Sequence, residues 1–349
     1  MRNGKSFIKK SRGNRKKAIF SKSKNEIKYL AIKELHETEN YSIKWMCEKL
    51  NITRSAYYKW LKREIPKKEL EDISLGETVN KYHDKYGGIL GYRRMTIFIN
   101  RNENKDYKYK RIRRIMKILD ISSSIRRVRK CCTISNKNDE KAENILNRNF
   151  EASRPNEKWT SDVCEFKIPK SDKKLYLSAF IDLYDRSIVS WQISYQNNNI
   201  LVFDTFDKAI EANPDAQPLF HSDRGFQYTS PAFKNKLEKQ GIQQSMSRVA
   251  CCLDNAVSEG LWGIFREEMY KLYDIHDEES LISAIENYIN FYNYHRYQER
   301  YDSKSPIEVR FEALKTNTPK FYPIPINKRI EKYKANLAMK NPTEITSIG

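Results

Sequence analysis

Residues 159–195 read WTSDVCEFKIPKSDKKLYLSAFIDLYDRSIVSWQISY, and this stretch holds three successive strand-like runs. The runs cover residues 159–168, 173–185 and 187–195, with polar turns between them. Runs of this length that are rich in Val, Ile, Tyr, Phe and Trp predict β-strands, and short polar turns predict hairpins between neighbours. The stretch therefore predicts a sheet that begins with three strands joined by hairpins.

The residues that follow change to an alternation of helices and short strands. We expect a helix and then a short strand, twice in succession, at residues 200–213, 218–223, 230–240 and 242–247. Long helical patterns continue from Asp254 to residue 296. A half built from hairpins, followed by strand–helix–strand units, predicts a mixed α/β domain, which we place at residues 157–312.

The N-terminal part of the chain predicts helices only. Residues 1–25 are basic with few large apolar groups, and we expect a flexible arm there. Over residues 26–65, Ser42 and Thr53 suit helix N-caps, and Asn51 suits a left-handed turn between two short helices. This pattern, with a basic second helix, predicts a DNA-binding helix-turn-helix unit, although an ordinary helical hairpin would share it. The outward residues expected to meet DNA are Arg54, Tyr58 and Lys59.

A second helical unit is predicted at residues 73–130, with helices at residues 91–101 and 108–121. Between Lys105 and Lys130 there are eleven Lys or Arg and only two acids. Such an excess of positive charge is repulsive unless phosphates neutralise it. A helix face that is only solvated normally carries both basic and acidic residues. We therefore expect this unit to contact DNA phosphates through Arg93, Lys110, Arg111 and Arg114.

The whole chain carries a formal net charge of +20, from 65 basic and 45 acidic residues. A charge of this sign points to a polyanionic partner, either nucleic acid or an anionic membrane surface. No apolar run approaches the ~18 residues that a membrane span needs, so nucleic acid is favoured. A polar linker at residues 131–156 and a basic tail at residues 313–349 flank the α/β domain.

The six cysteines include two adjacent pairs and no C-x-x-C spacing. This is neither a disulfide framework nor a zinc-binding pattern, and the five histidines are too scattered to add one. We expect a reduced, cytoplasmic protein.

Three acids stand where functional groups are expected. Asp162 lies inside the first strand, where an unpaired carboxylate is costly, and Asp223 follows the fourth strand in the stretch HSDRGFQYTS. Glu259 lies a little over one turn into the helix that begins near Asp254. Asp182 and Asp185 are rival candidates, although DLYDR also reads as a hairpin turn, and Asp254 suits a helix N-cap.

Carboxylates in a basic protein suit the cleavage of a phosphodiester. The reaction needs an activated water, neutralised phosphate oxygens and a stabilised leaving group, and two divalent ions ~3.5–4 Å apart meet all three needs. Mg²⁺ prefers oxygen ligands, so cysteine and histidine are not required. Bound metal would also offset the repulsion among the acids.

Several motifs resemble the catalytic region of the IS3-family insertion-sequence transposases, and more broadly the retroviral integrases with an RNase H-like core. They are WTSDV, YLSAFIDLYDRSIVSW, HSDRGFQYTS, SMSRVACCLDNAVSEGLWGIFREE and FYNYHR with SPIEVR, and LGYRRM matches the region before the core. That family has a DDE triad with 60 residues between the aspartates and 35 before the glutamate. Here 60 residues lie between Asp162 and Asp223, and 35 between Asp223 and Glu259. The chain departs from the family at residues 249–251, Val-Ala-Cys, where Lys-Gly-Asn is common.

The resemblance implies a DNA transposase with Asp162, Asp223 and Glu259 as catalytic residues and ligands of two Mg²⁺ or Mn²⁺ ions. Water would cut a strand at the element end, and the freed 3′-hydroxyl would attack a second phosphodiester directly. Arg266 takes the place of the family's basic residue seven positions after the glutamate and would contact DNA. Supporting roles are expected for Gln227, beside Asp223, and for Asn255, near the start of the glutamate helix.

The expected partners are the terminal inverted repeats of the element, the target DNA and further copies of this chain on DNA, in the nucleoid of a bacterium. Two other functions share part of the pattern. One is a non-catalytic DNA-binding regulator derived from a transposase, which would lose a ligand. The other is an RNase H-like nuclease acting on RNA–DNA hybrids, which would not need two upstream helical units.

Overall fold

The computed structural model describes residues 25–125, 144–147, 149–248 and 252–324. The chain divides into two compact units, Met1–Arg126 and Arg127–Gly349, and each is described by itself. The predicted arm, apart from Asn25, much of the predicted linker and the end of the predicted tail lie outside the described residues.

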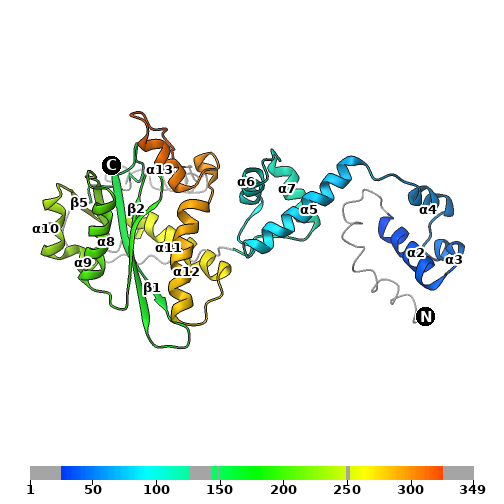
Figure 1. The fold of residues 1–349 in the computed structure, drawn as a ribbon, viewed down its shortest axis with the longest axis horizontal. Helices are drawn as coiled ribbons and strands as arrows, with labels where there is room; N and C mark the ends of the chain where they lie inside the picture. Colours follow the sequence, from blue (N-terminus) through cyan, green and yellow to red (C-terminus); the bar gives the residue numbers. More distant parts are fainter. Residues whose placement is uncertain (1–24, 126–143, 148, 249–251, 325–349) are drawn as a thin grey trace, which may run out of the picture. The chain divides into compact units, whose positions relative to one another are not determined.

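The described part of the first unit begins with three short helices, α2 (Glu26–Glu39), α3 (Ile43–Lys49) and α4 (Arg54–Leu61), shown in Figure 1. As predicted, Asn51 takes a left-handed conformation (φ 54°), and the Thr53 hydroxyl accepts a hydrogen bond from the backbone of α4. The three helices share a small core of Tyr29, Ile32, Met46, Cys47 and Tyr57. The sequence places Leu61 among the residues of this helix that pack inward with Tyr57 and Trp60, but Leu61 is 44% exposed. The helix–turn–helix arrangement of α3 and α4 matches the prediction.

Three further helices follow among the described residues of the first unit: α5 (Lys67–Lys85), α6 (Tyr92–Asn102) and α7 (Tyr109–Ile118). The apolar side of α7 is buried through Ile112, Ile115 and Met116, as its helical spacing predicts. Both predicted helices of this unit are therefore present. The long helix α5 was not predicted, because its pattern of apolar residues is weak and charged residues interrupt it throughout.

The second unit is built on a five-stranded sheet in the order β3-β2-β1-β4-β5. The strands are β1 (Lys158–Lys167), β2 (Lys174–Asp182), β3 (Ile188–Ser194), β4 (Leu219–Ser222) and β5 (Gln244–Met246). The hairpin-joined strands β1, β2 and β3 are antiparallel, whereas β4 pairs parallel to β1 and β5 parallel to β4. This confirms the mixed α/β class and all five predicted strands.

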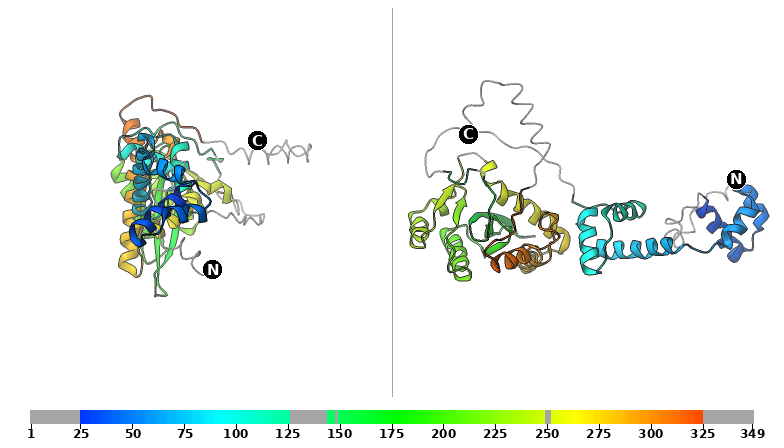
Figure 2. Two further views of the ribbon diagram at one scale, coloured as in Figure 1. Left: turned by 90° about the vertical axis from the view of Figure 1, so that its right-hand side faces the viewer. Right: turned by 90° about the horizontal axis from the view of Figure 1, so that it is seen from above.

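Helices cover the sheet on two sides (Figures 1 and 2). One side carries α8 (Asn199–Ala212), α9 (Phe226–Thr229) and α10 (Pro231–Lys239), which enclose a core with Trp159, Phe180 and Phe220 of the sheet. The other side carries η1 (Cys252–Asn255), α11 (Ala256–Leu272), α12 (Glu278–Asn290), the π-helix η2 (Phe291–His295), η3 (Glu299–Tyr301) and α13 (Pro306–Leu314). The site described next lies on this second side, between β1 and α11.

Candidate active site

Asp162 and Asp223 lie at the same level of two neighbouring parallel strands. Ser161 of β1 pairs with Ser222 of β4, and each aspartate is the next residue in its chain. Adjacent parallel strands lie about 4.8 Å apart, so consecutive register places the two carboxylates side by side. The pairing of β1 with β4 thus brings together two aspartates that are separated by 60 residues in the sequence.

Helix α11 runs along β1 with a matched repeat. Two strand residues advance about 6.6 Å and four helix residues about 6.0 Å, so every second residue of β1 meets a new turn of α11. The contacts follow this repeat, with pairs formed by Thr160 and Ser258, Asp162 and Trp262, and Cys164 and Arg266. Glu259, one residue after the first of these pairs, is brought to the level of the aspartates.

The pKa of Asp162 reflects the nearby acidic side chains. Burial, together with the negative charge of Asp223 and the weaker effect of Glu259, raises the pKa of Asp162 to about 7. A hydrogen bond from the backbone of Val163 (2.8 Å) opposes the rise. The buried indole N–H of Trp262 also opposes it, although that N–H meets no partner at normal hydrogen-bond geometry.

Glu259 is the outer member of the trio. It is exposed in the first turn of α11, and partial desolvation raises its pKa. Within the part of the chain that the structure describes, no three His, Cys, Asp or Glu side chains stand close enough together to hold one metal ion. Asp162 and Asp223 therefore form the close pair, and Glu259 approaches it from α11.

The loop after Asp223 is tightly fitted around that carboxylate. The backbone N–H of Gly225 donates to Asp223 Oδ1 (2.9 Å), and the side chain of Gln227 donates to Asn197, just before α8. A Cβ on Gly225 would lie 3.0 Å from Asp223 Oδ1 and 2.9 Å from Gln227 Oε1. Gly225 is therefore required for close approach and not for its backbone conformation, since its φ is −55°.

We expect Gly225→Ala to lower DNA strand cleavage by about 10- to 100-fold, because the added methyl group displaces the Asp223 carboxylate by a fraction of an ångström or more. Gly263→Ala is the matched control, since its Cβ would meet nothing within 4 Å. Cleavage by both variants is measured on the same DNA, with thermal unfolding to check folding. Equal activity of the two alanine variants would contradict the close fit.

Arg266 lies where its seven-residue spacing from Glu259 places it, on the side of α11 that meets β1. Its Nη2 donates to Cys164 Sγ (2.9 Å) and to the carbonyl of Glu165 (3.1 Å), and its guanidinium stacks over Phe166. Burial raises the pKa of Cys164 to about 11, although Arg266 opposes the rise, so the cysteine stays a thiol. Arg266 is exposed, so its role toward DNA stays a prediction.

A buried polar layer lies one pleat below the two aspartates. Thr160 and His221, each two residues before an aspartate, pair across β1 and β4, and Ser245 of β5 pairs with His221. Thr160 donates to Asn255 Oδ1 (3.1 Å), so Asn255 has a structural contact consistent with its predicted supporting role. Burial lowers the pKa of His221, which keeps the ring neutral.

Thr160, His221 and Ser245 were not among the predicted site residues. A signal was present, since Thr-Ser-Asp and His-Ser-Asp repeat one pattern. In a strand the first and third residues of such a triplet share a face, so the residue two before each aspartate lies directly below it.

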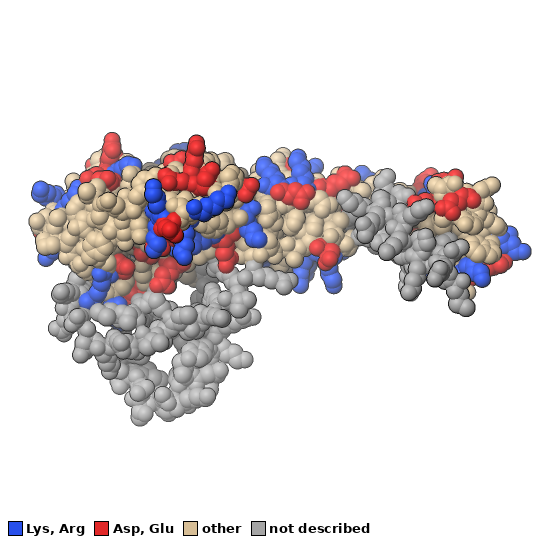
Figure 3. Space-filling model, turned by 90° about the horizontal axis from the view of Figure 1, so that it is seen from below, with Lys and Arg blue, Asp and Glu red and all other residues tan. Residues whose placement is uncertain are grey.

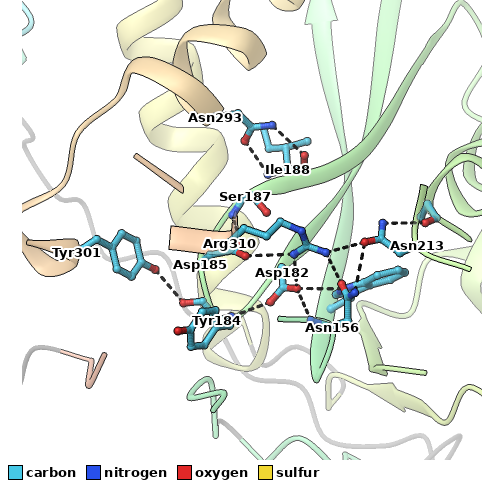
Figure 4. A network of polar contacts seen from close by, with 12 residues as sticks. Asn156, Asp182, Tyr184, Asp185, Ser187, Ile188, Asn213, Asn293, Tyr301 and Arg310 are labelled. Atoms are coloured by element: carbon cyan, nitrogen blue, oxygen red, sulfur yellow. Dashed lines mark hydrogen bonds and ion pairs between the residues drawn. The ribbon is translucent and has the colours of Figure 1, made fainter. Parts of the chain in front are cut away.

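The rival acids Asp182 and Asp185 belong to a different buried network (Figure 4). Arg310 Nη1 of α13 donates to Asp182 Oδ2 (2.8 Å) and Asp185 Oδ2 (3.1 Å). Asp182 also accepts from the backbone of Asn156 (2.7 Å), and Asn156 and Asn213 each accept from Arg310 Nη2. These hydrogen bonds hold α13 against the β2–β3 hairpin. The two acids therefore stabilise the fold and are not available as catalytic groups.

Asp254 differs from its expected role as a helix N-cap. Asn255 holds the N-cap position of α11, and no side chain caps that helix. The Asp254 carboxylate instead pairs with the Arg248 guanidinium (2.8 and 3.0 Å) and accepts from Asn144 (2.8 Å). Residues 249–251, where the sequence departs from the resembled family, lie between these partners and outside the described residues.

The predicted DNA contacts of the first unit are all in its described part. Arg54, Tyr58 and Lys59 are exposed on α4, as expected of a recognition helix. Their contact with DNA stays a prediction.

On α6 and α7 the predicted contacts differ in their surroundings. Arg93 and Lys110 are exposed. Arg111 Nε and Arg114 Nη2, however, donate to the buried Asp72 of α5 (3.0 and 2.5 Å). Although burial opposes it, hydrogen bonds from Arg114 and Arg111 lower the pKa of Asp72. Arg111 and Arg114 thus hold α7 to α5, and Lys110 is a stronger candidate for DNA contact than either.

The charge pattern of the described surface fits this view. On the face shown in Figure 3, Lys and Arg side chains alternate with Asp and Glu.

Three family descriptions match the chain. "Integrase core domain" matches residues 152–252 and, as a second description, residues 259–315, whereas "HTH-like domain" matches residues 69–129. The integrase matches cover the sheet and the helices around it, and each contains part of the acidic trio. They confirm that the α/β unit is an integrase core preceded by helical units.

Named relatives point the same way. The transposase InsK for insertion sequence element IS150 of Escherichia coli (strain K12) is 34% identical over 242 residues, which are 69% of this chain and 83% of that protein. A transposase-like protein of Haemophilus influenzae is 34% identical over 206 residues, 59% of this chain and 94% of that protein.

Among solved structures, the catalytic core of HTLV-2 integrase in complex with magnesium matches with a TM-score of 0.35 and 19% identity, over 45% of this chain and 97% of that one. A simian T-cell lymphotropic virus intasome matches with a TM-score of 0.42 and 14% identity, over 72% of this chain and 80% of that one. Within the described residues, no helix has the length and apolar character of a membrane span.

Proposed function

The chain belongs to the IS3-family insertion-sequence transposases, and we propose that it cleaves the ends of its element and joins them to target DNA through Asp162, Asp223 and Glu259. The observation that carries the proposal is the placement of Asp162 and Asp223 side by side on parallel strands, with Glu259 brought to them by α11. The helical units before the core imply binding to DNA.

Divalent cations fit the chemistry of these residues. The donor set is carboxylate oxygen alone, which suits Mg²⁺ or Mn²⁺, and the raised pKa of Asp162 marks repulsion that a cation would remove. When bound, two such ions would activate water, neutralise phosphate oxygens and stabilise the leaving group. Asp162 and Asp223 would hold one or both ions, and Glu259 would complete the second site after a change of rotamer.

The chain's own residues have distinct tasks in this proposal. Gly225 keeps the Asp223 carboxylate in place, and Asp162 must lose its proton before it binds a cation. Arg266, held along β1, would meet a DNA phosphate beside the cleaved bond. The reaction then needs no covalent bond between protein and DNA.

DNA binding by the α6–α7 region can be tested through its dependence on salt. We expect Lys110→Gln with Lys117→Gln to flatten the slope of log K against log salt concentration by about two, since each phosphate contact contributes about 0.9. Both lysines are exposed on α7. The control replaces Lys239 and Lys315, exposed in the other unit, by Gln. Equal flattening by both pairs would mean that the slope reports net charge alone.

The function itself is tested by incubating the purified protein with labelled DNA from the two element ends and Mg²⁺. We expect a nicked strand with a free 3′-hydroxyl, joined products, and loss of both on chelation. Binding without cleavage would favour the non-catalytic regulator. Cleavage of the RNA strand of an RNA–DNA hybrid, with the element ends left intact, would favour the nuclease.

The assembly is a further part of the proposal. Two element ends must be brought together for joining, so we expect a homo-oligomer on DNA, in the bacterial cytoplasm and at the nucleoid. Light scattering of the protein with and without end DNA measures this directly.

A further inference from the structure

Helix α11 carries Glu259 in its first turn, and no side-chain cap holds that turn. Five other helices, α4, α8, α10, α12 and α13, begin with a side chain that accepts from the backbone of the first turn. The N-cap of α11, Asn255, makes no such bond. A helix without a side-chain cap lacks one contact that steadies its first turn, so contacts from elsewhere in the fold have a larger part in setting the position of Glu259.

That contact comes from the sheet. Thr160 Oγ1 donates to Asn255 Oδ1 (3.1 Å) and lies 3.0 Å from Ser258 Oγ. His221 Nε2 hydrogen-bonds to the carbonyl of Asp254 (3.0 Å). The segment from Asp254 to Ser258, which leads directly into Glu259, is therefore bound from two strands.

The three sheet residues form one row across β1, β4 and β5. Thr160 pairs with His221 and His221 with Ser245 in the strand register, and His221 Nδ1 lies 2.9 Å from Ser245 Oγ. Their exposed fractions are 1%, 0% and 0%. Buried polar groups of this kind are costly unless paired. Here the pairings run along the row and up to the start of α11, with further hydrogen bonds from Leu146 N to Ser245 Oγ (3.0 Å) and between His221 Nε2 and Ser247 Oγ (3.2 Å).

The row is also tied to both aspartates. Thr160 and His221 lie two residues before Asp162 and Asp223, on the same faces of their strands. A shift of the row would therefore move the glutamate helix relative to both aspartates.

Building on the proposed function, we propose that Thr160, His221 and Ser245 are positioning residues that set the distance of Glu259 from Asp162 and Asp223. They touch no substrate and act through Asp254, Asn255 and Ser258. Removing one hydroxyl of the row should loosen the glutamate and weaken metal binding while the fold persists.

Thr160 offers a matched pair of variants. Thr160→Val keeps the shape and removes the hydroxyl, whereas Thr160→Ser keeps the hydroxyl. Mn²⁺ binding to the full chain, without DNA, is measured from the free Mn²⁺ signal in electron paramagnetic resonance. We expect about tenfold weaker binding for Thr160→Val, as for other residues that orient metal ligands, and near-wild-type binding for Thr160→Ser.

The Glu259→Gln background tells a positioning role from a general effect on the fold. In that background Thr160→Val should leave the remaining Mn²⁺ affinity unchanged, because there is no carboxylate left to position. Ser258→Ala should mimic Thr160→Val, and it serves if the valine variant does not fold. Ser283→Ala, an exposed serine of α12, is its control.

The outcomes separate this inference from the proposed function. Equal Mn²⁺ affinities for wild type, Thr160→Val and Ser258→Ala would overturn the positioning role alone. A further loss on adding Thr160→Val to Glu259→Gln would also overturn it. A wild-type protein that binds no Mn²⁺ and cleaves no end DNA would overturn the proposed function and this inference with it.

Discussion

Asp223→Asn is expected to lower cleavage of element-end DNA by at least about a thousandfold, because a metal site contributes several kcal/mol to the transition state and each 1.4 kcal/mol is a factor of ten. Asp162→Asn and Glu259→Gln should have effects of the same order. Each change keeps the shape of the side chain and removes its charge. Initial rates of strand nicking in Mg²⁺, with equal protein and DNA, measure the effect.

Folding should not account for that loss. The Asp162 carboxylate has a raised pKa, so its ionised form opposes folding, and Asp162→Asn should leave the unfolding midpoint at pH 8 unchanged or higher. Matched controls are Asp204→Asn and Glu211→Gln, two exposed acids of α8. Near-wild-type cleavage by any member of the trio would contradict the assignment of that member.

Arg310→Met is expected to destabilise the catalytic unit by about 3–5 kcal/mol, because it leaves Asp182 and Asp185 buried without their counter-ion. For a unit of this size the midpoint of thermal unfolding should fall by roughly 10 °C. Lys304→Met is the control. Lys304 forms a partly exposed ion pair with Glu312, which lies on α13 like Arg310, and such a pair contributes below about 1 kcal/mol.

The pH dependence of the Arg310 variant has a definite sign. Burial and the charge of Asp182 raise the pKa of Asp185 even with Arg310 present. A carboxyl whose pKa is higher in the folded state binds its proton more tightly there, so stability falls as pH rises from the unfolded value toward the folded one. Without Arg310 the pKa of Asp185 should rise further. The loss of unfolding free energy caused by Arg310→Met should therefore be smaller at pH 5 than at pH 8. A deficit independent of pH would show that lost packing, and not charge, causes it.

The sequence was most informative where local pattern and burial agree. The strands β1 to β3 are runs rich in β-branched and aromatic residues, as predicted. The resemblance to the IS3 family singled out Asp162, Asp223 and Glu259, and the charges of Asp223 and Glu259 do raise the pKa of Asp162. The helix α9 escaped prediction, because it has only four residues and no periodicity.

Long-range partners were not predictable from local pattern. Asp182 and Asp185 could not be told from catalytic acids, because Arg310 reaches them from more than 120 residues away. Arg111 and Arg114 read as free basic groups until α5 brought Asp72 between them. The inward packing expected of Leu61 failed for a similar reason, since helical spacing does not say whether a neighbour exists to cover the stripe.

The central claim is that Asp162, Asp223 and Glu259 gather around divalent ions. The most direct test is a crystal structure of the protein with Mn²⁺ and cleaved end DNA, in which anomalous scattering locates the metal. We predict manganese within coordinating distance of the Asp162 and Asp223 carboxylates, with Glu259 turned inward to join them. Manganese absent from this position, or Glu259 still directed to solvent while DNA is bound, would contradict the account.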